Sequence, residues 1–368
     1  MRLLIVNAGS SSVKLRVLDA GNQVLASRDL PAPESDEASD ALAAFVTDEA
    51  DDVRAVAHRI VHGGSGFDDS VVVDDAVRDQ LDTLAELAPL HVPPALAALD
   101  SVRRLRPALP AVACFDTTFH RTLPDEAAVY ALPWEWTEQW GVRRFGFHGL
   151  SHRYASRRAA QLLSRRPAGL RVVTCHLGSG ASLAAVHGGV SVDTTMGFTP
   201  LDGLMMGTRS GAVDPGALLW IQRRHGIGVA EMEDSLDRQS GLLGVSGRSA
   251  DMREVVAAAH DGDERAALAV RMFVHRVRAG VAAMAAAMGG LDAVVFTGGI
   301  GEGSPLIREQ VCAGLAFLGV DLDAAADHIV ARDDADLSRP HARVRVLLVH
   351  AREDVEMARD ARRLLGTR

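Results

Sequence analysis

A short pattern at the N-terminus occurs a second time near the middle of the chain. Residues 3–6 are apolar, residues 7–12 read NAGSSS, and residues 13–17 alternate between apolar and polar, which predicts a strand, a tight turn and a strand. The segment that begins at Arg171 has the same order, with Gly178 in the place of Gly9 and His176 in the place of Asn7. The offset is 169 residues in a chain of 368. A repeat of that length favours a duplicated domain over a solenoid.

The rest of the chain alternates between buried strands and helices, which is typical of an α/β sheet. Two similar halves of this kind would leave a cleft between them. Apolar runs predict further strands at residues 53–61, 111–115, 292–297 and 344–349. Helical periodicity predicts helices at residues 76–87, 94–105, 215–224 and 265–288 and from about residue 353.

Composition narrows the classes of partner. A formal net charge of −9 argues against binding a nucleic-acid backbone over a broad surface. No apolar stretch approaches the roughly 20 residues that cross a bilayer, and the apolar run at the N-terminus is too short for a secretory signal. Three widely spaced cysteines favour buried thiols in a reducing compartment. We therefore expect a cytoplasmic protein with small-molecule partners, no nucleic acid and no membrane.

Three turns rich in glycine and serine, at residues 9–12, 178–182 and 298–303, follow predicted strands. The backbone N–H groups of such turns can bind phosphate. None has the GxxxxGK[ST] pattern, and Ser304 stands where a dinucleotide-binding turn needs its last glycine. Of the 39 basic residues only Lys14 is a lysine, and it follows the first turn. Each turn alone is equally consistent with an ordinary tight turn.

Two arginines next to polar clusters are candidates for binding anions. Arg59 lies in HRIVHGG and Arg209 in MMGTRSG, and a guanidinium matches carboxylate and phosphate oxygens in pairs, which a lysine cannot do. In a chain this rich in arginine, either residue alone could also be an ordinary solvated side chain. Polar residues that follow buried strands do, however, lie where α/β folds place their ligands.

Nine motifs in order along the chain carry a resemblance to a known family: NAGSSSVK, HRIVHGG, LAPLH, FDTTFH, GFHGLSH, TCHLGSGAS, VDTTMGFTPLDGLMMGTRSG, FTGGIGE and EDVEMARD. The chain resembles the acetate and propionate kinase family of the actin, sugar-kinase and Hsp70 superfamily. The resemblance implies two duplicated ribonuclease H-like (actin-like ATPase) domains with a cleft between them. It places an acyl- and metal-side domain at residues 1–168 and 353–368, and a nucleotide-binding domain at residues 169–352.

The resemblance implies reversible transfer of the ATP γ-phosphoryl group to a short-chain carboxylate. Acetate or acetyl phosphate and ATP or ADP are then the substrates, Mg²⁺ is the cofactor with Mn²⁺ as an alternative, and a homodimer is expected. Arg59 and Arg209 would hold the carboxylate and the phosphoryl group, and His148 would stabilise that group in the transition state. Asp116 would be the essential carboxylate, and Asn7 and Glu353 would lie around the metal.

The remaining site residues are also implied by the resemblance. The apolar pocket for the acyl group matches Val61, Leu90, Phe147 and Pro200, each of which is also compatible with ordinary core packing. Ser10, Ser12 and Lys14 would support the phosphates. The nucleotide would contact Lys14, His176, Leu177, Gly178, Ser179, Gly180, Asp251, Met252, Arg253, Gly299, Ile300, Gly301 and Gly303.

Alternatives to an acetate kinase remain open at this point. A kinase for propionate or another short-chain carboxylate differs only in its acyl pocket, and a hydrophobic slot separates substrates by only about 1–3 kcal/mol per methylene. A non-catalytic actin-like protein would bind ATP without forming acyl phosphate. The combination of Arg59, His148 and Arg209 favours a kinase over a scaffold, because an ATP clamp alone has no use for them. The sequence leaves the donor nucleotide and the direction of the reaction open.

Overall fold

The computed structural model describes residues 1–9, 12–31, 36–329 and 333–366, which form two compact units. Unit 1 comprises Met1–Arg121, Phe147–Tyr154 and Arg352–Arg368, and unit 2 comprises Thr122–Gly146 and Ala155–Ala351. Each unit is described by itself. The domain bounds expected from the sequence, 1–168 with 353–368 and 169–352, stay a prediction.

Unit 1 is built on a mixed sheet with the strand order β3-β2-β1-β4-β6-β5. Strands β1, β4 and β6 are parallel, β1 pairs with β2 and β2 with β3 in antiparallel fashion, and β5 lies antiparallel to β6. The three central strands therefore end at the same edge of the sheet. The strand bounds are β1 Leu3–Ala8, β2 Val13–Leu18, β3 Val24–Leu30, β4 Ala55–Ile60, β5 Val71–Val72 and β6 Ala111–Phe115.

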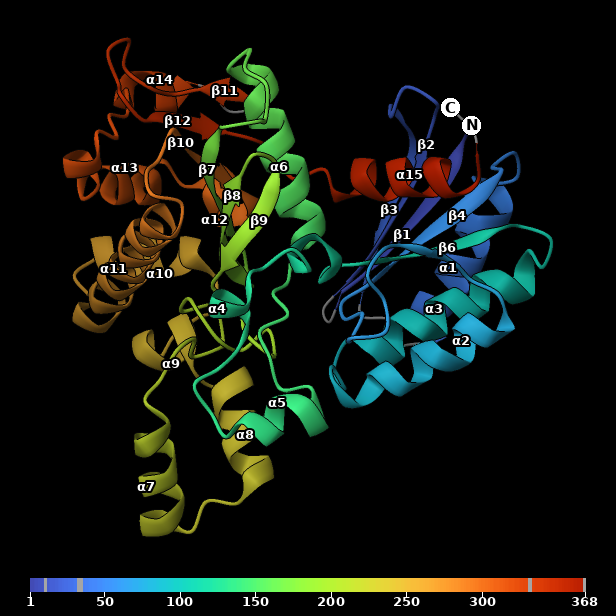
Figure 1. The fold of residues 1–368 in the computed structure, drawn as a ribbon, viewed down its shortest axis with the longest axis horizontal. Helices are drawn as coiled ribbons and strands as arrows, with labels where there is room; N and C mark the ends of the chain where they lie inside the picture. The colour runs from blue at the N-terminus through green and yellow to red at the C-terminus, as the bar shows by residue number, and fades with distance from the viewer. Residues whose placement is uncertain (10–11, 32–35, 330–332, 367–368) are drawn as a thin grey trace. The chain divides into compact units, whose positions relative to one another are not determined.

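Helices cover both faces of this sheet, with α1 and α3 on one side and α15 on the other (Figure 1). Side chains alternate between the faces of a strand. On β1, Leu4 and Val6 pack into the core under α1 and α3, whereas Leu3 and Ile5 pack with Met357 of α15. The helices are α1 Asp36–Asp48, α2 Asp75–Asp82, α3 Val92–Leu105 and α15 Glu353–Leu364, with 3₁₀ turns at η1 Thr83–Glu86 and η2 Thr118–His120.

Unit 2 repeats the topology of unit 1. Its strand order is β11-β12-β10-β7-β8-β9, in which β7, β10 and β12 are parallel and the other pairs are antiparallel. The pairing matches that of unit 1 strand for strand, and this confirms the duplication expected from the repeated N-terminal pattern. The strands are β7 Arg171–Leu177, β8 Ala181–His187, β9 Val190–Thr194, β10 Ala293–Thr297, β11 Ala335–Asp336 and β12 Arg345–Leu348.

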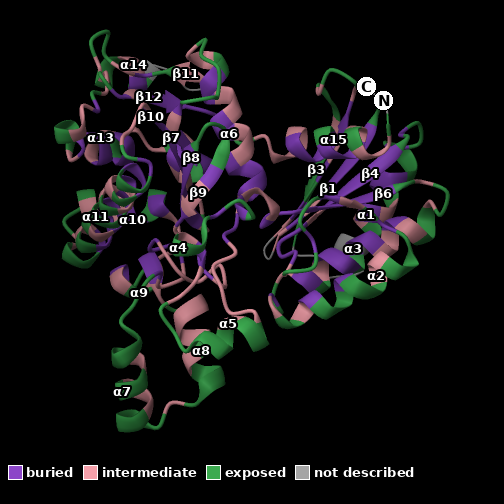
Figure 2. Cartoon of the chain, in the orientation of Figure 1, coloured by how far each residue is buried: buried purple, intermediate pink, exposed green. Residues whose placement is uncertain are grey.

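The long helix α11 packs against β7 and β8 of this second sheet. Their contact is close, since a Cβ built at Gly280 would lie 2.5 Å from Cδ1 of Leu183. Figure 2 shows both sheets largely buried, whereas α7 is mostly exposed. Helix α6 begins in unit 1 and continues into unit 2. The remaining helices are α4 Asp125–Ala128, α5 Trp134–Trp140, α6 Gly149–Leu162, α7 Pro215–His225, α8 Val229–Arg238, α9 Gly241–Ser246, α10 Met252–His260, α11 Glu264–Ala287, α12 Gly298–Gly303, α13 Pro305–Ala313, η3 Ala316–Leu318 and α14 Ala324–Ile329.

Most sequence-based expectations for the elements are confirmed, and two are wrong in detail. The glycine run at residues 298–303 forms the short helix α12 rather than a loop. Ser304 ends that helix and caps α13, since its hydroxyl accepts a hydrogen bond from the N–H of Ile307. The acidic composition of residues 31–40 predicts a surface loop, but α1 begins at Asp36. No helix in the described ranges is long and apolar enough to cross a membrane, and the three cysteines are buried and free.

Candidate functional site

The three parallel strands of unit 1 each place a polar residue at the carboxyl end, on the face covered by α15. Asn7 continues the α15-facing series of β1, Arg59 that of β4, and Asp116 follows Cys114 on the same face of β6. Neighbouring parallel strands bring these three side chains together at one edge of the sheet. The sequence therefore builds a polar cluster on an otherwise apolar face.

Arg59 is the centre of this cluster. Its Nε donates to Oδ1 of Asp116 at 2.9 Å and its Nη2 to Oδ2 at 2.5 Å, which is a two-point ion pair. Its Nη1 donates to Oδ1 of Asn7 at 3.0 Å. Asp116 is buried, and 14% of the Arg59 side chain is exposed. A guanidinium has five N–H donors, so two remain for an anion from outside.

Asn7 links this pair to the helix that covers the sheet. Its Nδ2 donates to Oε2 of Glu353 at 2.7 Å, and Oε2 lies 4.0 Å from Nη1 of Arg59. Glu353 is the first residue of α15. The positive end of the helix dipole favours a carboxylate there.

Burial and charge act against each other at these groups. Burial opposes the charged form of Arg59, but the carboxylates of Asp116 and Glu353 outweigh it, so the pKa of the guanidinium is raised. Burial raises the pKa of the Asp116 carboxyl, although Arg59 and the backbone N–H of His148 act to lower it. Arg59 is therefore a permanent cation, and Asp116 depends on it to stay ionised.

His148 is held next to Asp116 by the backbone. It has a φ of 55°, which is unusual for a residue other than glycine. The N–H of the following Gly149 donates to the carbonyl oxygen of Asp116 at 2.9 Å, and a ring nitrogen of His120 lies 2.9 Å from the carbonyl oxygen of Phe147. These contacts fix the turn at the start of α6. The structure thus brings Asn7, Arg59, Asp116, His148 and Glu353 together in unit 1.

The residues expected in the acyl pocket are divided between the units. Val61 and Phe147 are buried in unit 1, where the ring of Phe147 packs edge-on against His62 with centroids 5.3 Å apart. Leu90 is 39% exposed. Pro200 is half-buried in unit 2. A common pocket for these four stays a prediction.

Arg209 lies in unit 2, at the end of the segment 193–209. Its Nε is 3.7 Å from Oδ1 of Asp237, and its Nη1 donates to the carbonyl oxygen of Pro200 at 3.4 Å. Burial lowers the pKa of Arg209, and Asp237 only partly offsets this.

The residues expected to bind the nucleotide gather around two turns of unit 2. The turn between β7 and β8 is closed by the N–H of Gly178, which donates to the carbonyl oxygen of Gly180 at 3.0 Å. A Cβ at Gly178 would lie 3.8 Å from the backbone nitrogen of Gly299, so this turn and the start of α12 are close. His176 and Leu177 end β7, Ser179 is exposed in the turn, and Ile300, Gly301 and Gly303 lie in α12.

Three further nucleotide candidates stand at the start of α10. Asp251 caps the helix by accepting from the N–H of Arg253 and pairs with its guanidinium at 2.5 Å. Met252 is buried. Because Arg253 is exposed and Asp251 is half-buried, this pair is accessible from solvent.

Lys14, also expected on the nucleotide side, lies in unit 1. It stands directly opposite Asn7 in the β1–β2 pairing, so the two side chains share a face. Lys14 is exposed, and Ser12 follows the turn. Ser10 lies outside the described residues.

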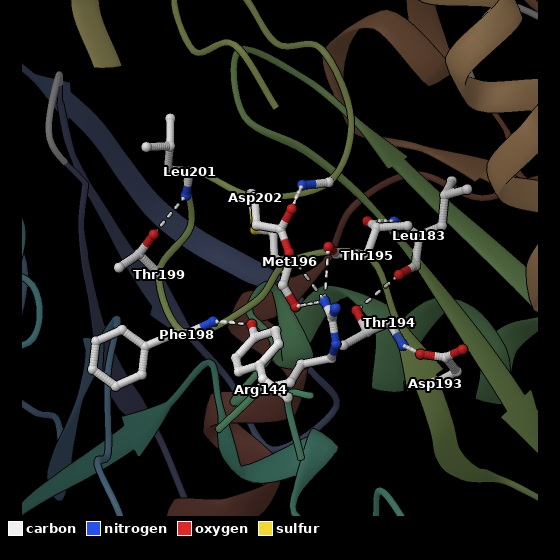
Figure 3. A network of polar contacts seen from close by, with 12 residues as sticks. Arg144, Leu183, Asp193, Thr194, Thr195, Met196, Phe198, Thr199, Leu201 and Asp202 are labelled. Atoms are coloured by element: carbon white, nitrogen blue, oxygen red, sulfur yellow. Dashed lines mark hydrogen bonds and ion pairs between the residues drawn. The ribbon is translucent and has the colours of Figure 1, made fainter. Parts of the chain in front are cut away.

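Sequence reasoning missed a set of residues that supports these groups. Arg144 and Asp202 form a polar network around the loop at residues 195–203 (Figure 3). Tyr130 contacts the same loop and the Arg144 guanidinium. Arg144 lies in RRFG, Asp202 in TPLDG and Tyr130 in VYALP, and none of these segments has the periodicity that would reveal a contact.

The chemistry of the cluster in unit 1 suits a hard cation. Asn7, Asp116 and Glu353 offer amide and carboxylate oxygens, the ligands that Mg²⁺ prefers. Within the described ranges no group of three or more His, Cys, Asp or Glu side chains could hold a metal by itself.

Comparison with known proteins gives one consistent result. A model described as the Acetokinase family matches residues 35–359. An acetate kinase of Shouchella clausii is 47% identical over 312 residues, which are 85% of this chain and 79% of that protein. The crystal structure of Porphyromonas gingivalis acetate kinase superposes with a TM-score of 0.90 at 37% identity and 99% coverage of both chains.

A propionate kinase from Francisella tularensis is nearly as similar, with a TM-score of 0.89 at 35% identity and 98% coverage of both chains. These likenesses extend over the whole chain, and they agree with the two duplicated actin-like ATPase domains expected from the sequence. With a match over most of its length, the chain belongs to the Acetokinase family.

Proposed function

We propose that this protein transfers the γ-phosphoryl group of ATP to acetate, giving acetyl phosphate and ADP, and catalyses the reverse reaction. One observation in the fold carries the proposal: Arg59, held by Asp116 and Asn7, keeps two N–H donors for an incoming carboxylate. Relatives named acetate kinase support the choice of acetate.

The reaction requires the protein mainly to align the two substrates and to offset the repulsion between their negative charges. A carboxylate oxygen of acetate forms a bond to the γ-phosphorus while the bond from phosphorus to the β-phosphate oxygen breaks, and the electron pair leaves with ADP. Acetate is already ionised at neutral pH, so no general base is required. Two anions must approach each other, and cationic side chains offset their repulsion.

Each candidate residue has a role in this scheme. Arg59 would bind the carboxylate, with Asp116 fixing the orientation of its guanidinium. Arg209 and His148 would stabilise charge on the equatorial phosphoryl oxygens, where a loose transition state spreads it. Val61, Leu90, Phe147 and Pro200 would contact the methyl group, and the turn at residues 178–180 and the helix α12 would contact the nucleotide.

We further propose that Mg²⁺ is the cofactor and that Asn7, Glu353 and Asp116 provide its protein side. The ion would neutralise phosphate charge when it is bound with ATP. Lys14 would support the phosphates from the same face of the sheet as Asn7. A cytoplasmic location is consistent with free, buried cysteines.

A homodimer is the expected assembly. Trp134, Trp140 and Trp220 are more than half exposed, at 59%, 62% and 55%, and such surface is typical of a protein interface. Light scattering of the purified protein measures the assembly.

Trapping of acyl phosphate as a hydroxamate, with ATP, Mg²⁺ and acetate, tests the reaction. We expect product from the wild-type protein and a large loss in Arg59→Ala and Arg209→Ala. Equal product from these variants would refute the assigned roles. ATP binding without product would instead indicate an actin-like scaffold.

Propionate is a second candidate acceptor, because a propionate kinase is among the similar structures. The same assay with acetate, propionate and butyrate ranks the acceptors by kcat/KM.

A further inference from the structure

The loop at residues 195–203 of unit 2 carries Pro200, and Arg144 contacts both of its ends. We propose that Arg144 is a positioning residue that sets selectivity for the chain length of the carboxylate by fixing this loop. The inference rests on the proposed function, in which Pro200 contacts the acyl group.

A single nitrogen of Arg144 makes the decisive contacts. Nη1 donates to the carbonyl oxygen of Thr195 at 3.0 Å and to that of Met196 at 2.9 Å. It also lies 3.4 Å from Oδ2 of Asp202 at the other end of the loop (Figure 3). The guanidinium therefore links the two ends of the loop, at residues 195 and 202.

Tyr130 makes a second contact that fixes the same loop. Its hydroxyl oxygen accepts a hydrogen bond from the N–H of Phe198 at 2.8 Å, and the Arg144 guanidinium lies 5.5 Å from the centre of its ring. Burial raises the pKa of Tyr130, so its phenol stays neutral beside the Arg144 guanidinium.

The backbone next to Arg144 holds the middle of the loop. The N–H groups of Phe145 and Gly146 both donate to the carbonyl oxygen of Gly197, at 3.1 and 3.2 Å. A Cβ at Gly197 would lie 2.3 Å from the hydroxyl of Tyr130 and 2.7 Å from Oδ2 of Asp202, so any other residue there would have to displace these side chains. Packing this close leaves the loop little freedom to move.

The loop positions Pro200, which is expected to contact the substrate. Nη1 of Arg209 donates to the carbonyl oxygen of Pro200 at 3.4 Å, so the loop fixes one partner of the phosphoryl-binding arginine as well as the apolar ring. The chain runs from Arg144 through Gly146 directly to Phe147 and His148. Arg144 therefore anchors the segment that leads to Phe147, which is expected to contact the acyl group, and to His148, which is expected to stabilise the transition state.

This network differs in kind from a purely structural ion pair. An apolar slot separates acids that differ by one methylene only while its wall is rigid, and the limit is about 10- to 200-fold. Without the contacts of Arg144 to the loop, Pro200 could move to make room for a longer acyl chain. Acetate would lose the most, because its productive binding depends on alignment in a small pocket.

The test compares Arg144→Met with Arg144→Lys, Asp202→Asn, Tyr130→Phe and a control. Arg78→Met is the matched control, since 17% of the Arg78 side chain is exposed against 19% for Arg144, and Arg78 also pairs with carboxylates, Asp82 and Asp100. The readouts are kcat and KM for acetate, propionate and butyrate by hydroxamate formation, KM for ATP, and circular dichroism to confirm folding.

We expect Arg144→Met to lower kcat/KM for acetate by about 10- to 100-fold, as small misplacements do. The loss for butyrate should be smaller, so the ratio of acetate to butyrate falls, while KM for ATP is unchanged. Tyr130→Phe and Asp202→Asn should shift the ratio in the same direction by less, and Arg144→Lys should restore part of it. Arg78→Met should leave all ratios at the wild-type value.

An unchanged ratio in a folded Arg144→Met protein would overturn the inference, as would an equal loss for all three acids accompanied by a rise in KM for ATP. If Arg144→Met does not fold, the ratio in Tyr130→Phe and Asp202→Asn decides in the same way. If the wild-type protein forms no acyl phosphate from any of the acids, the proposed function fails and the inference fails with it. If the wild-type protein is active but the variants keep its selectivity, the inference about Arg144 fails and the proposed function stands.

Discussion

The amide of Asn7 donates a 2.7 Å hydrogen bond to the carboxylate of Glu353, across 346 residues of sequence. The same amide accepts a hydrogen bond through its oxygen from Arg59. Asn7 therefore connects the group that would bind the carboxylate to the helix terminus on the expected metal side. A side chain that both donates and accepts is needed for this, and an aspartate or a leucine at the position could not replace it.

Replacing Glu353 with Gln should weaken the response to the metal. The amide keeps the size of the side chain but loses the charge that attracts Mg²⁺. We expect the Mg²⁺ concentration for half-maximal activity to rise by about 10- to 100-fold. Titration of activity with MgCl₂ measures this, and Glu309→Gln, which removes a hydrogen-bonded carboxylate of α13, is the control. A wild-type titration curve would exclude Glu353 from the metal side.

Removing Arg59 should affect both activity and folding. Arg59→Met leaves the buried carboxylate of Asp116 without its two-point partner, which costs about 3–5 kcal/mol of the free energy of unfolding. The double variant Arg59→Met with Asp116→Asn should recover part of this stability but no activity. Urea denaturation and the hydroxamate assay separate the two effects. Recovery of activity in the double variant would contradict the role of Arg59 in binding substrate.

His58 should make the protein sensitive to acid. Burial lowers its pKa to about 3, with a smaller opposing effect of Asp100, whereas the unfolded chain has a histidine pKa of about 6.5. Below pH 6.5 the unfolded state takes up a proton that the folded state refuses, so stability falls progressively as the pH drops from 6.5 to 3. Neither ring nitrogen has a hydrogen-bond partner among the described residues.

His58→Leu should therefore gain stability relative to the wild type as the pH is lowered. The difference in the free energy of unfolding should grow by about 2 kcal/mol between pH 7.5 and pH 5. Urea denaturation at the two pH values measures it, with His260→Leu as the control for loss of an exposed histidine. Parallel curves for wild type and His58→Leu would show that His58 is protonated in the fold.

Gly149→Ala should damage the turn that carries His148. A Cβ at this position would lie 2.2 Å from the carbonyl oxygen of Asp116 and 2.8 Å from Cβ of Phe119, so the backbone must shift. We expect a loss of about 1–3 kcal/mol of stability and a fall in kcat. Gly66→Ala is the matched control, because nothing lies within 4 Å of its Cβ. Wild-type kcat in Gly149→Ala would show that the placement of His148 tolerates movement.

The strands of the repeated sheet can be predicted from the sequence, but some of the helices that pack on the sheets cannot. Apolar runs identify β1 and β6, because a strand buried on both faces is apolar along its length, and period-two alternation after the turn residues identifies β2. The helix α1 was missed because its start lies in an acidic segment whose composition also suits a surface loop. The run 298–303 predicts a loop because glycine is a poor helix former, and the tertiary structure overrides that preference.

For the candidate site, the strand ends were predictable and the contacts between them were not. Asn7 and Arg59 lie at the carboxyl ends of β1 and β4, Asp116 follows β6, and parallel pairing brings these ends together. The hydrogen bonds of Arg144 go to backbone oxygens, which every residue has, so no pattern of residue types reveals them. The role of Glu353 came only through resemblance, since nothing local distinguishes it from Asp354.

The position of α15 in unit 1 has a consequence for synthesis in the cell. The apolar face formed by Leu3, Ile5 and Ala57 is covered by α15, which the ribosome makes only after unit 2. While residues 155–351 are translated, this face of the first sheet lacks the cover of α15. The nascent chain is thus a natural client for chaperones that shield apolar surface, and a late premature stop codon would produce a protein with an open core rather than a merely shortened one.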